Sequence, residues 1–273
     1  MIWKIFLIVD NVLDGIRKKT VVILELSGKS VVNVDKKAEK IIFKVAFDGN
    51  EPDIQKYFDL DRDYEKIKFE LSNIDEYLKN SIEYGSGIRL LNQDLFETII
   101  SFIISANNNI PRIKGIIERI SEKYGDKIEA FGKTYYSFPT PKQLSKASVE
   151  ELRKLGLGFR DVRVFETTRK ISSGEFNLEE LYGLTTPEAK EKLETLDGVG
   201  PKVCDCILLF SDLKRLDVFP IDVWVRRVMN ELYIHNDEES KVNKKDIQKL
   251  ADEKFGALQG IAQQYLFYWK REA

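Results

Sequence analysis

Hydrophobic and polar positions change their period once along the chain. Within residues 20–47, three β-branched runs, TVVILEL, SVVNV and KIIFKVAF, are separated by polar segments. Such runs between polar turns predict short antiparallel strands joined by hairpins. From Asp53 onward, the apolar residues recur at helical spacing. We therefore predict an α+β protein, with a small antiparallel β-rich N-terminal domain at residues 1–87 and a mostly helical, two-lobed body at residues 88–273.

Capping signals indicate where the helices begin and end. Three N-cap residues are each followed three positions later by Glu or Gln, which is the spacing of a capping box: Asp94 and Glu97, Thr140 and Gln143, and Ser148 and Glu151. Gly125, Gly156 and Gly174 mark helix ends. Further helices are predicted at residues 112–124, 161–172, 187–196, 201–213, 222–233, 244–255 and 260–271. No internal repeat or long linker interrupts this order.

Residues 187–213 carry the most informative local pattern, two predicted helices joined by the turn DGVG. Gly198 and Gly200 permit backbone conformations that other residues avoid. The turn presents unpaired N–H groups at a helix N-terminus, where a phosphate binds without a basic side chain. A helix-hairpin-helix contact with DNA and an ordinary packing corner both remain open on this stretch alone. A nucleotide P-loop is excluded, because the spacing GxxxxGK[ST] is absent and no strand precedes the turn.

Two ionisable residues near this turn are candidates for chemistry. Lys202 lies in the first turn of the predicted helix, where the positive end of the helix dipole disfavours an ammonium and favours the free amine of a nucleophile. Asp222 follows Pro220 at the predicted N-cap of the next helix. A carboxylate facing Lys202 would also stabilise positive charge in a sugar transition state. Capping and catalysis are compatible roles for Asp222, and the sequence favours neither.

Composition excludes several classes of function. The formal net charge of -2 and the pI near 5.8 argue against coating of nucleic acid by bulk charge, although a local basic face is possible. His235 is the only histidine, which excludes Ser-His-Asp and His-rich metal chemistry. Cys204 and Cys206 stand in an apolar helical pattern, so neither a disulfide nor a structural metal is expected. The apolar N-terminus is too short to span a bilayer. We expect a soluble, cytoplasmic protein.

Five motifs occur in an order that is similar to the 8-oxoguanine DNA glycosylase family, within the helix-hairpin-helix glycosylase superfamily. They are SFIISANNNIPRI, KLGLGFR, LDGVGPKVCDC, FPIDVWV and IAQQYLF. The resemblance covers residues 57–267. It implies that the protein acts on double-stranded DNA containing oxidised guanine, in association with the nucleoid. We expect a monomer that needs no cofactor.

The resemblance implies a role for five residues at the reacting base. Lys202 matches the nucleophile that attacks the deoxyribose, expels the base and leaves a Schiff base able to cleave the strand. Asp222 matches the catalytic aspartate. Cys206 and Phe267 match the pair that sandwich the extruded base, and Gln263 matches the side chain that reads its Watson–Crick face. By periodicity alone, Phe267 is also a candidate core residue.

Four further residues match family positions that contact the opened duplex. Asn107 matches the asparagine that fills the gap left by the extruded base. Arg112 and Arg160 match the arginines around the orphaned cytosine, and Phe159 stands where a wedging aromatic is expected. The alternatives are a helix stop for Asn107 and solvated helix-end charges for the arginines. Trp224 stands where some relatives have a phosphate-contacting histidine, so that contact is not expected here.

One family motif is missing. The family's N-terminal domain contains Gly-Gln-x-Phe-Arg-Trp, including a glycine whose carbonyl recognises the oxidised base, but IVDNVLDGIRKKT stands in its place. A nucleotide string that encodes residues 1–15 gives DLENIFDCGQCFRW when it is read from its third base. We hypothesise that these residues are an out-of-frame reading and that the native frame resumes near residues 17–19. If the printed sequence is native, base recognition loses a principal contact.

The expected function is excision of 8-oxoguanine opposite cytosine, with β-elimination at the abasic site. Two alternatives remain: a glycosylase for another damaged base, and a non-catalytic helix-hairpin-helix DNA-binding protein. The presence of both Lys202 and Asp222 disfavours the last, because phosphate binding requires neither.

Overall fold

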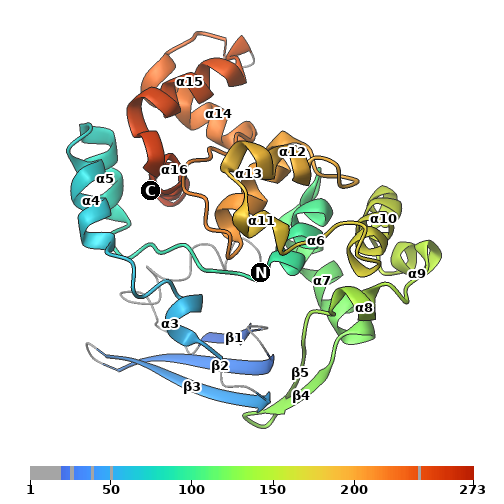
Figure 1. Ribbon diagram of the computed structural model, residues 1–273. Helices are drawn as coiled ribbons and strands as arrows, with labels where there is room; N and C mark the ends of the chain where they lie inside the picture. The colour runs from blue at the N-terminus through green and yellow to red at the C-terminus, as the bar shows by residue number, and fades with distance from the viewer. Residues whose placement is uncertain (1–19, 25–27, 38–39, 50–51, 239–240) are drawn as a thin grey trace.

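The N-terminal part of the computed structural model is a three-stranded antiparallel sheet (Figure 1). The structure describes residues 20–24, 28–37, 40–49, 52–238 and 241–273. The strands are β1 (Thr20–Leu24), β2 (Gly28–Lys37) and β3 (Lys40–Gly49), in the order β1-β2-β3. Val32 of β2 lies opposite Val22 on one side and Val45 on the other. The strands predicted within residues 20–47 are therefore confirmed.

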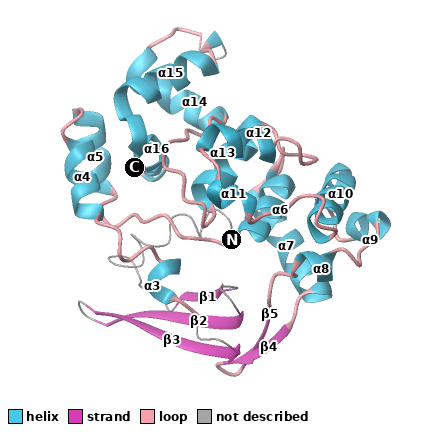
Figure 2. Cartoon of the chain, viewed as in Figure 1, coloured by secondary structure: helices cyan, strands magenta, loops and turns pink. Residues whose placement is uncertain are grey.

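The remainder of the described chain is mostly helical (Figure 2). Before the hairpin region the helices are α3 (Ile54–Tyr57), α4 (Tyr64–Ser72), α5 (Glu76–Tyr84), α6 (Leu95–Ser105), α7 (Ile110–Tyr124), α8 (Pro141–Leu144), α9 (Val149–Lys154), η1 (Gly158–Arg160), α10 (Asp161–Ser172) and α11 (Glu180–Gly183). They are followed by α12 (Thr186–Leu193), α13 (Pro201–Phe210), α14 (Val223–Met229), η2 (Asn230–Ile234), α15 (Lys244–Phe255), η4 (Gly256–Leu258) and α16 (Gln259–Glu272). The predicted α+β class is confirmed.

The capping signals locate several helix ends well. The predicted bounds of α10 and α15 agree with the structure, and the capping boxes at Thr140 and Ser148 are both formed. Asp94 caps α6 by accepting the Glu97 N–H at 2.8 Å, which is one of the two bonds of the predicted box. The helix predicted at residues 222–233 is α14 followed by the π-helix η2. That change of hydrogen-bond spacing leaves little trace in hydrophobic periodicity.

The prediction that the chain is helical from Asp53 onward is wrong at one place. Strands β4 (Lys127–Ala130) and β5 (Lys133–Tyr136) form an antiparallel hairpin. Its turn residues Phe131 and Gly132 both have positive φ, 52° and 72°, as a two-residue hairpin of the primed type requires. Ile128 and Ala130 alternate inward and pack with Val31 of β2. The hairpin therefore extends the apolar contacts of the N-terminal sheet.

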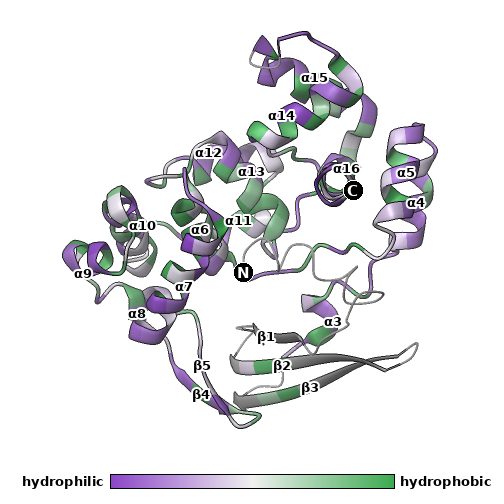
Figure 3. Cartoon of the chain, turned by 180° about the vertical axis from the view of Figure 1, so that it is seen from behind, coloured by the Kyte–Doolittle hydropathy of each residue, from purple (hydrophilic) through white to green (hydrophobic). Residues whose placement is uncertain are grey.

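A single apolar core connects α4 and α5 to the helical body. Leu78 of α5, Ile99 of α6, Ile207 of α13 and Leu266 of α16 belong to one buried cluster, and Figure 3 shows α13 and α6 largely in the hydrophobic colour. Burial of one such side chain contributes roughly 1.5–3 kcal/mol. This packing fixes α13 and α16, the two helices that carry most of the candidate site. The predicted division at residue 87 stays a prediction.

Candidate active site

The turn between α12 and α13 has the backbone of a tight hairpin. Gly198 has φ +89°, and a Cβ there would meet Arg163 Cδ at 3.0 Å and Ile103 Cγ2 at 3.1 Å. The positive φ therefore favours glycine at 198, and any Cβ there would also need Arg163 and Ile103 to move by a few tenths of an ångström. Gly200 instead has an extended backbone with φ -103°, and a Cβ there would enter open space. The conformational reason predicted for glycine holds at 198 and is wrong at 200, while the expected contact of both with DNA remains a prediction.

Lys202 is the second residue of α13 and reaches toward α6. The Cys204 N–H donates to Gly200 O at 2.9 Å, so the amides before Cys204 belong to the first turn, which lacks intrahelical acceptors. The Lys202 Nζ lies 5.5 Å from the centroid of the Phe102 ring, within cation–π distance. The side chain is partly buried. Its amine is therefore placed beside an apolar wall and not in open solvent.

Asp222 is the N-cap of α14, as predicted. Its carboxylate accepts the Val225 N–H at 2.8 Å. The same side chain lines a small cavity together with Lys202. The cavity is lined by Phe102, Lys202, Cys206, Phe210, Pro220, Asp222, Val225, Gln263, Gln264 and Phe267. The structure therefore brings together all five residues predicted to act at the reacting base.

The cavity is closed around its own polar groups. The Gln263 amide donates from Nε2 to Pro220 O and accepts from Gln264 Nε2, the latter at 2.9 Å. Gln263 and Phe267 are only 3% and 5% exposed. The space open to a water-sized sphere is about 20 Å³, which is about enough for one water molecule. A purine enters only if lining side chains move.

Cys206 contributes a neutral thiol to this cavity. Burial raises the pKa of Cys206 to about 11, although the nearby Lys202 ammonium and its hydrogen bond act in the opposite direction. The thiol is therefore protonated at neutral pH and is a polarisable contact surface, not a nucleophile. Among the described residues, no three His, Cys, Asp or Glu side chains lie close enough to bind a metal ion.

A second group of predicted residues lies together at the turn between α6 and α7, with Asn107 on the turn and Phe159 and Arg160 on η1. Arg160 is 2% exposed and donates to Ala106 O at 2.8 Å and to Asn107 O at 2.6 Å. Its guanidinium carbon lies 4.2 Å from the centroid of the Phe159 ring, which is 55% exposed. Asn107 itself is exposed and has a positive φ of 49°. The interpretation of Arg160 as a solvated charge is wrong, because its donors fix the backbone of this turn.

Arg112 and Asn109 complete the surroundings of that turn. Arg112 is exposed in the first turn of α7 and donates to Gly156 O at 3.1 Å. Asn109 caps α7 by accepting the Arg112 N–H at 3.0 Å. The run of three asparagines therefore both ends α6 and begins α7. Trp224, for which no phosphate contact is predicted, is 36% exposed beside Asp222.

Sequence reasoning missed five residues of the cavity wall: Phe102, Phe210, Pro220, Val225 and Gln264. Phe210 lies four residues after Cys206 on α13, so helical spacing predicts that both face the same side. The Phe102 and Phe210 rings stack with centroids 5.8 Å apart. Nothing in the local sequence separates Phe102 from the other apolar residues of α6. The missing N-terminal motif falls on residues 1–19, outside the described residues.

The chain matches two family models in sequence order. Residues 16–99 match the 8-oxoguanine DNA glycosylase N-terminal domain, and residues 100–253 match the HhH-GPD superfamily of base excision DNA repair proteins. The chain therefore belongs to the HhH-GPD superfamily and, within it, to the 8-oxoguanine DNA glycosylase family. The family predicted from the five motifs is confirmed.

Relatives and solved structures agree with this assignment. A "Probable N-glycosylase/DNA lyase" of Methanothermobacter thermautotrophicus is 33% identical over 81% of this chain and 74% of its own length. The N-glycosylase/DNA lyase of Saccharomyces cerevisiae is 38% identical over 54% of this chain, which spans 42% of that protein. The Clostridium acetobutylicum 8-oxoguanine glycosylase/lyase, solved with double-stranded DNA containing cytosine opposite 8-oxoG, has a TM-score of 0.83 and 44% identity, covering 93% of this chain and 85% of its own. No helix in the described part of this chain is long and apolar enough to cross a membrane.

Proposed function

We propose that the protein excises 8-oxoguanine opposite cytosine from double-stranded DNA and cleaves the strand at the resulting abasic site. The observation that carries this proposal is the shared cavity in which Lys202 and Asp222 lie with Cys206, Gln263 and Phe267. The named activity of the Clostridium acetobutylicum relative supports the choice of lesion and of opposite base. The cytoplasm, in association with the nucleoid, is the proposed place of action.

Lys202 is the proposed nucleophile. Its neutral amine forms a bond to C1′ of the deoxyribose as the glycosidic bond breaks, and the departing base accepts a proton. Ring opening of the sugar then gives a protonated Schiff base with Lys202. Transfer of a C2′ proton to water expels the 3′ phosphate, which completes β-elimination. No cofactor is required, since each step uses the side chain and the sugar.

Asp222 is the proposed electrostatic partner of this reaction. Positive charge develops on the sugar as the glycosidic bond breaks, and a fixed carboxylate facing it stabilises that charge. The hydrogen bond from the Val225 N–H holds the carboxylate in one orientation. The orientation of the Asp222 carboxylate that caps α14 is therefore also the one proposed for catalysis.

Base recognition requires extrusion of the lesion from the stack and opening of the cavity. Extrusion costs a few kcal/mol, which compensating contacts must offset. Cys206 and Phe267 offer polarisable and aromatic faces to the base, and Gln263 offers amide groups to its edge. In the duplex, Asn107 and Phe159 would fill and wedge the gap. Arg112 and Arg160 would receive the orphaned cytosine, for which Arg160 must exchange its carbonyl acceptors.

Borohydride trapping tests the proposal directly. The protein is incubated with duplexes carrying 8-oxoguanine opposite cytosine, an abasic site opposite cytosine, or no damage. Covalent capture on the lesion duplex, lost in Lys202→Gln and retained in the matched control Lys192→Gln, is the expected result. Capture on the abasic duplex alone would contradict excision of 8-oxoguanine, and no capture on any duplex would favour the non-catalytic DNA-binding alternative.

The proposed reading-frame error predicts weak capture on the 8-oxoguanine duplex for the printed sequence. The N-terminal family match begins at residue 16, which supports the proposal that the native frame resumes near residues 17–19. We expect capture on 8-oxoguanine to be stronger for a chain in which DLENIFDCGQCFRW replaces residues 1–15. Sequencing of the gene across these codons decides the point, because a nucleotide string whose third frame lacks this motif would refute the error.

A further inference from the structure

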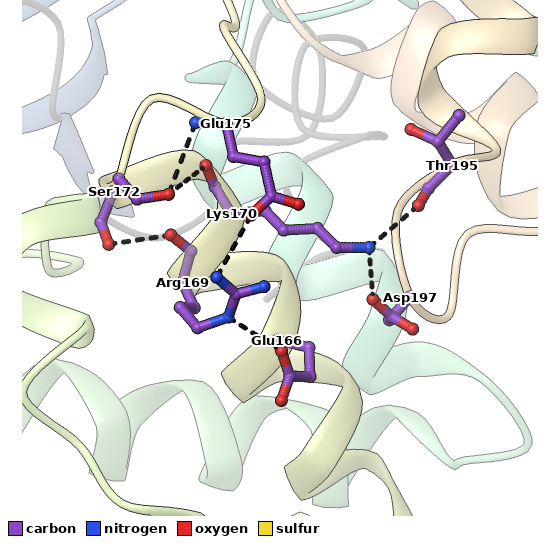
Figure 4. Close-up of polar contacts among 8 residues, drawn as sticks. Glu166, Arg169, Lys170, Ser172, Glu175, Thr195 and Asp197 are labelled. Atoms are coloured by element: carbon purple, nitrogen blue, oxygen red, sulfur yellow. Dashed lines mark hydrogen bonds and ion pairs between the residues drawn. The ribbon is translucent and has the colours of Figure 1, made fainter.

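Helix α10 contacts the hairpin turn through two side chains one helical turn apart. The Lys170 Nζ donates to Asp197 Oδ2 at 2.8 Å and to Thr195 O at 3.3 Å, as Figure 4 shows. The Thr167 hydroxyl, which is fully buried, donates to Asp197 O at 3.1 Å. Both the side chain and the backbone of Asp197 are therefore bound by α10.

The neighbouring arginine has different partners. Arg169 pairs with Glu166 at 3.0 Å and with Glu175 at 3.2 Å, and in Figure 4 dashed lines join its guanidinium to these two carboxylates. Lys170 is thus the cation that this part of α10 directs at the hairpin. Arg163 of α10 also lies beside the turn, where its Cδ would meet a Cβ at Gly198 at 3.0 Å, but Lys170 is the α10 cation that bonds to Asp197.

Asp197 is an unfavourable residue for its location. It directly precedes Gly198 in the turn whose amides are proposed to bind a DNA phosphate. A carboxylate in this turn adds negative charge where the phosphate is proposed to bind, and like charges repel each other. The Lys170 ammonium at 2.8 Å cancels that charge locally.

We propose that Lys170 supports DNA binding by neutralising Asp197 beside the hairpin turn. This inference rests on the proposed function, because it requires the turn to contact the DNA backbone. Lys170 does not contact the reacting atoms. Its loss affects the affinity for duplex DNA and leaves the chemical step unchanged.

An ordinary surface ion pair would behave differently. The Lys170 and Asp197 side chains are 24% and 46% exposed, and such pairs contribute little to the free energy of unfolding. A merely structural pair would therefore leave DNA affinity unchanged. If Lys170 contacted a phosphate directly, its replacement would weaken DNA binding whatever residue stands at position 197.

Four variants separate these possibilities: Lys170→Met, Lys170→Arg, Asp197→Asn and the Lys170→Met/Asp197→Asn double variant. Lys192→Met is the matched control, because Lys192 is 27% exposed on the adjoining α12 and pairs with Glu180 outside the turn. For each protein we would measure the Kd for a duplex carrying a tetrahydrofuran abasic analogue at several salt concentrations. KM and kcat on the 8-oxoguanine duplex, and the Tm, would be measured in parallel.

We expect Lys170→Met to weaken binding about three- to tenfold at low salt, with a smaller difference at high salt. Its kcat should equal that of the wild type while KM rises. Lys170→Arg, the double variant and Lys192→Met should all bind within about twofold of wild type. Asp197→Asn alone should bind as tightly as wild type or more tightly.

Two results would overturn the inference: Lys170→Met binding as well as Lys192→Met, or a double variant as weak as Lys170→Met. Failure of the proposed function is read separately, from wild-type excision of the 8-oxoguanine duplex. A wild-type protein that binds the abasic analogue without excising 8-oxoguanine refutes that lesion assignment and leaves the Lys170 comparison valid. A wild-type protein that binds no duplex refutes both.

Discussion

Substitution of Asp222 separates its two roles. Asn is as good an N-cap as Asp, so Asp222→Asn should retain the hydrogen bond from the Val225 N–H, now 2.8 Å long, and change the free energy of unfolding by less than about 0.5 kcal/mol. Asp222→Ala loses the cap and should cost about 1 kcal/mol. For a chain of this size, that loss lowers the Tm by about 2–4 °C.

The excision rate should depend on the charge of residue 222 and not on the free energy of unfolding. Both variants lose the carboxylate that is proposed to face the sugar, and removal of one preorganised electrostatic group lowers the rate by about 10²–10³-fold. The assay is single-turnover excision from the 8-oxoguanine duplex, with thermal unfolding measured on the same samples. Asp63→Ala is the matched control, because Asp63 caps α4 by accepting the Lys66 N–H at 2.9 Å and does not line the cavity. It should lower the Tm without changing the rate.

A full excision rate in Asp222→Asn would refute the catalytic role and leave only the cap. A Tm as low in Asp222→Asn as in Asp222→Ala would instead refute the argument that the N-cap hydrogen bond is what Asp222 contributes to folding.

Three further predictions concern the hairpin, the duplex-facing turn and the thiols. Gly198→Ala should destabilise the fold by about 1–3 kcal/mol in denaturant titrations and weaken duplex binding, because φ is +89° and the Cβ meets Arg163 at 3.0 Å; an unchanged midpoint would contradict this. Arg160→Met should cost about 1–3 kcal/mol, since it removes donors from buried surroundings, whereas the exposed Arg112→Met should cost under about 0.5 kcal/mol; equal losses would refute the distinction. Burial raises the pKa of Cys206 to about 11 and that of Cys204 to about 12. The burial of the protonated thiols therefore stabilises the fold fully below the ordinary thiol pKa, and this stabilisation is lost as the pH rises through 11. A thiol reagent at pH 8 should modify both cysteines only after unfolding.

The sequence predicts the fold best where local chemistry and tertiary packing agree. The capping boxes at Thr140 and Ser148 and the bounds of α10 could be read directly, because each depends on residues a few positions apart. The β4–β5 hairpin could not, since its strands have four residues each and its turn is Phe131-Gly132 instead of Asn-Gly. Its inward residues depend on contact with Val31, almost one hundred positions away.

The candidate site could likewise be predicted only in part from the sequence. The motifs predicted the residues around Lys202 because their order along the chain is a family pattern. Periodicity could not place Phe102 in the cavity wall, since it is one of many apolar residues on α6. Arg160 illustrates a different limit, because an arginine followed by a polar helix start usually faces solvent. Its burial depends on the carbonyls of a turn more than fifty residues earlier.

The closed state of the cavity also sets how strongly a free ligand competes with DNA. With space for about one water molecule beside Gln263 and Phe267, only a fraction of molecules is open to a purine at any moment. The apparent Kd of a free base equals its intrinsic Kd divided by that fraction. An extruded nucleotide arrives tethered to a duplex already bound elsewhere, which raises its effective concentration at the cavity. We therefore expect free purines to inhibit this protein weakly, and compounds that bind an opened form of the cavity to gain affinity that size and shape alone do not predict.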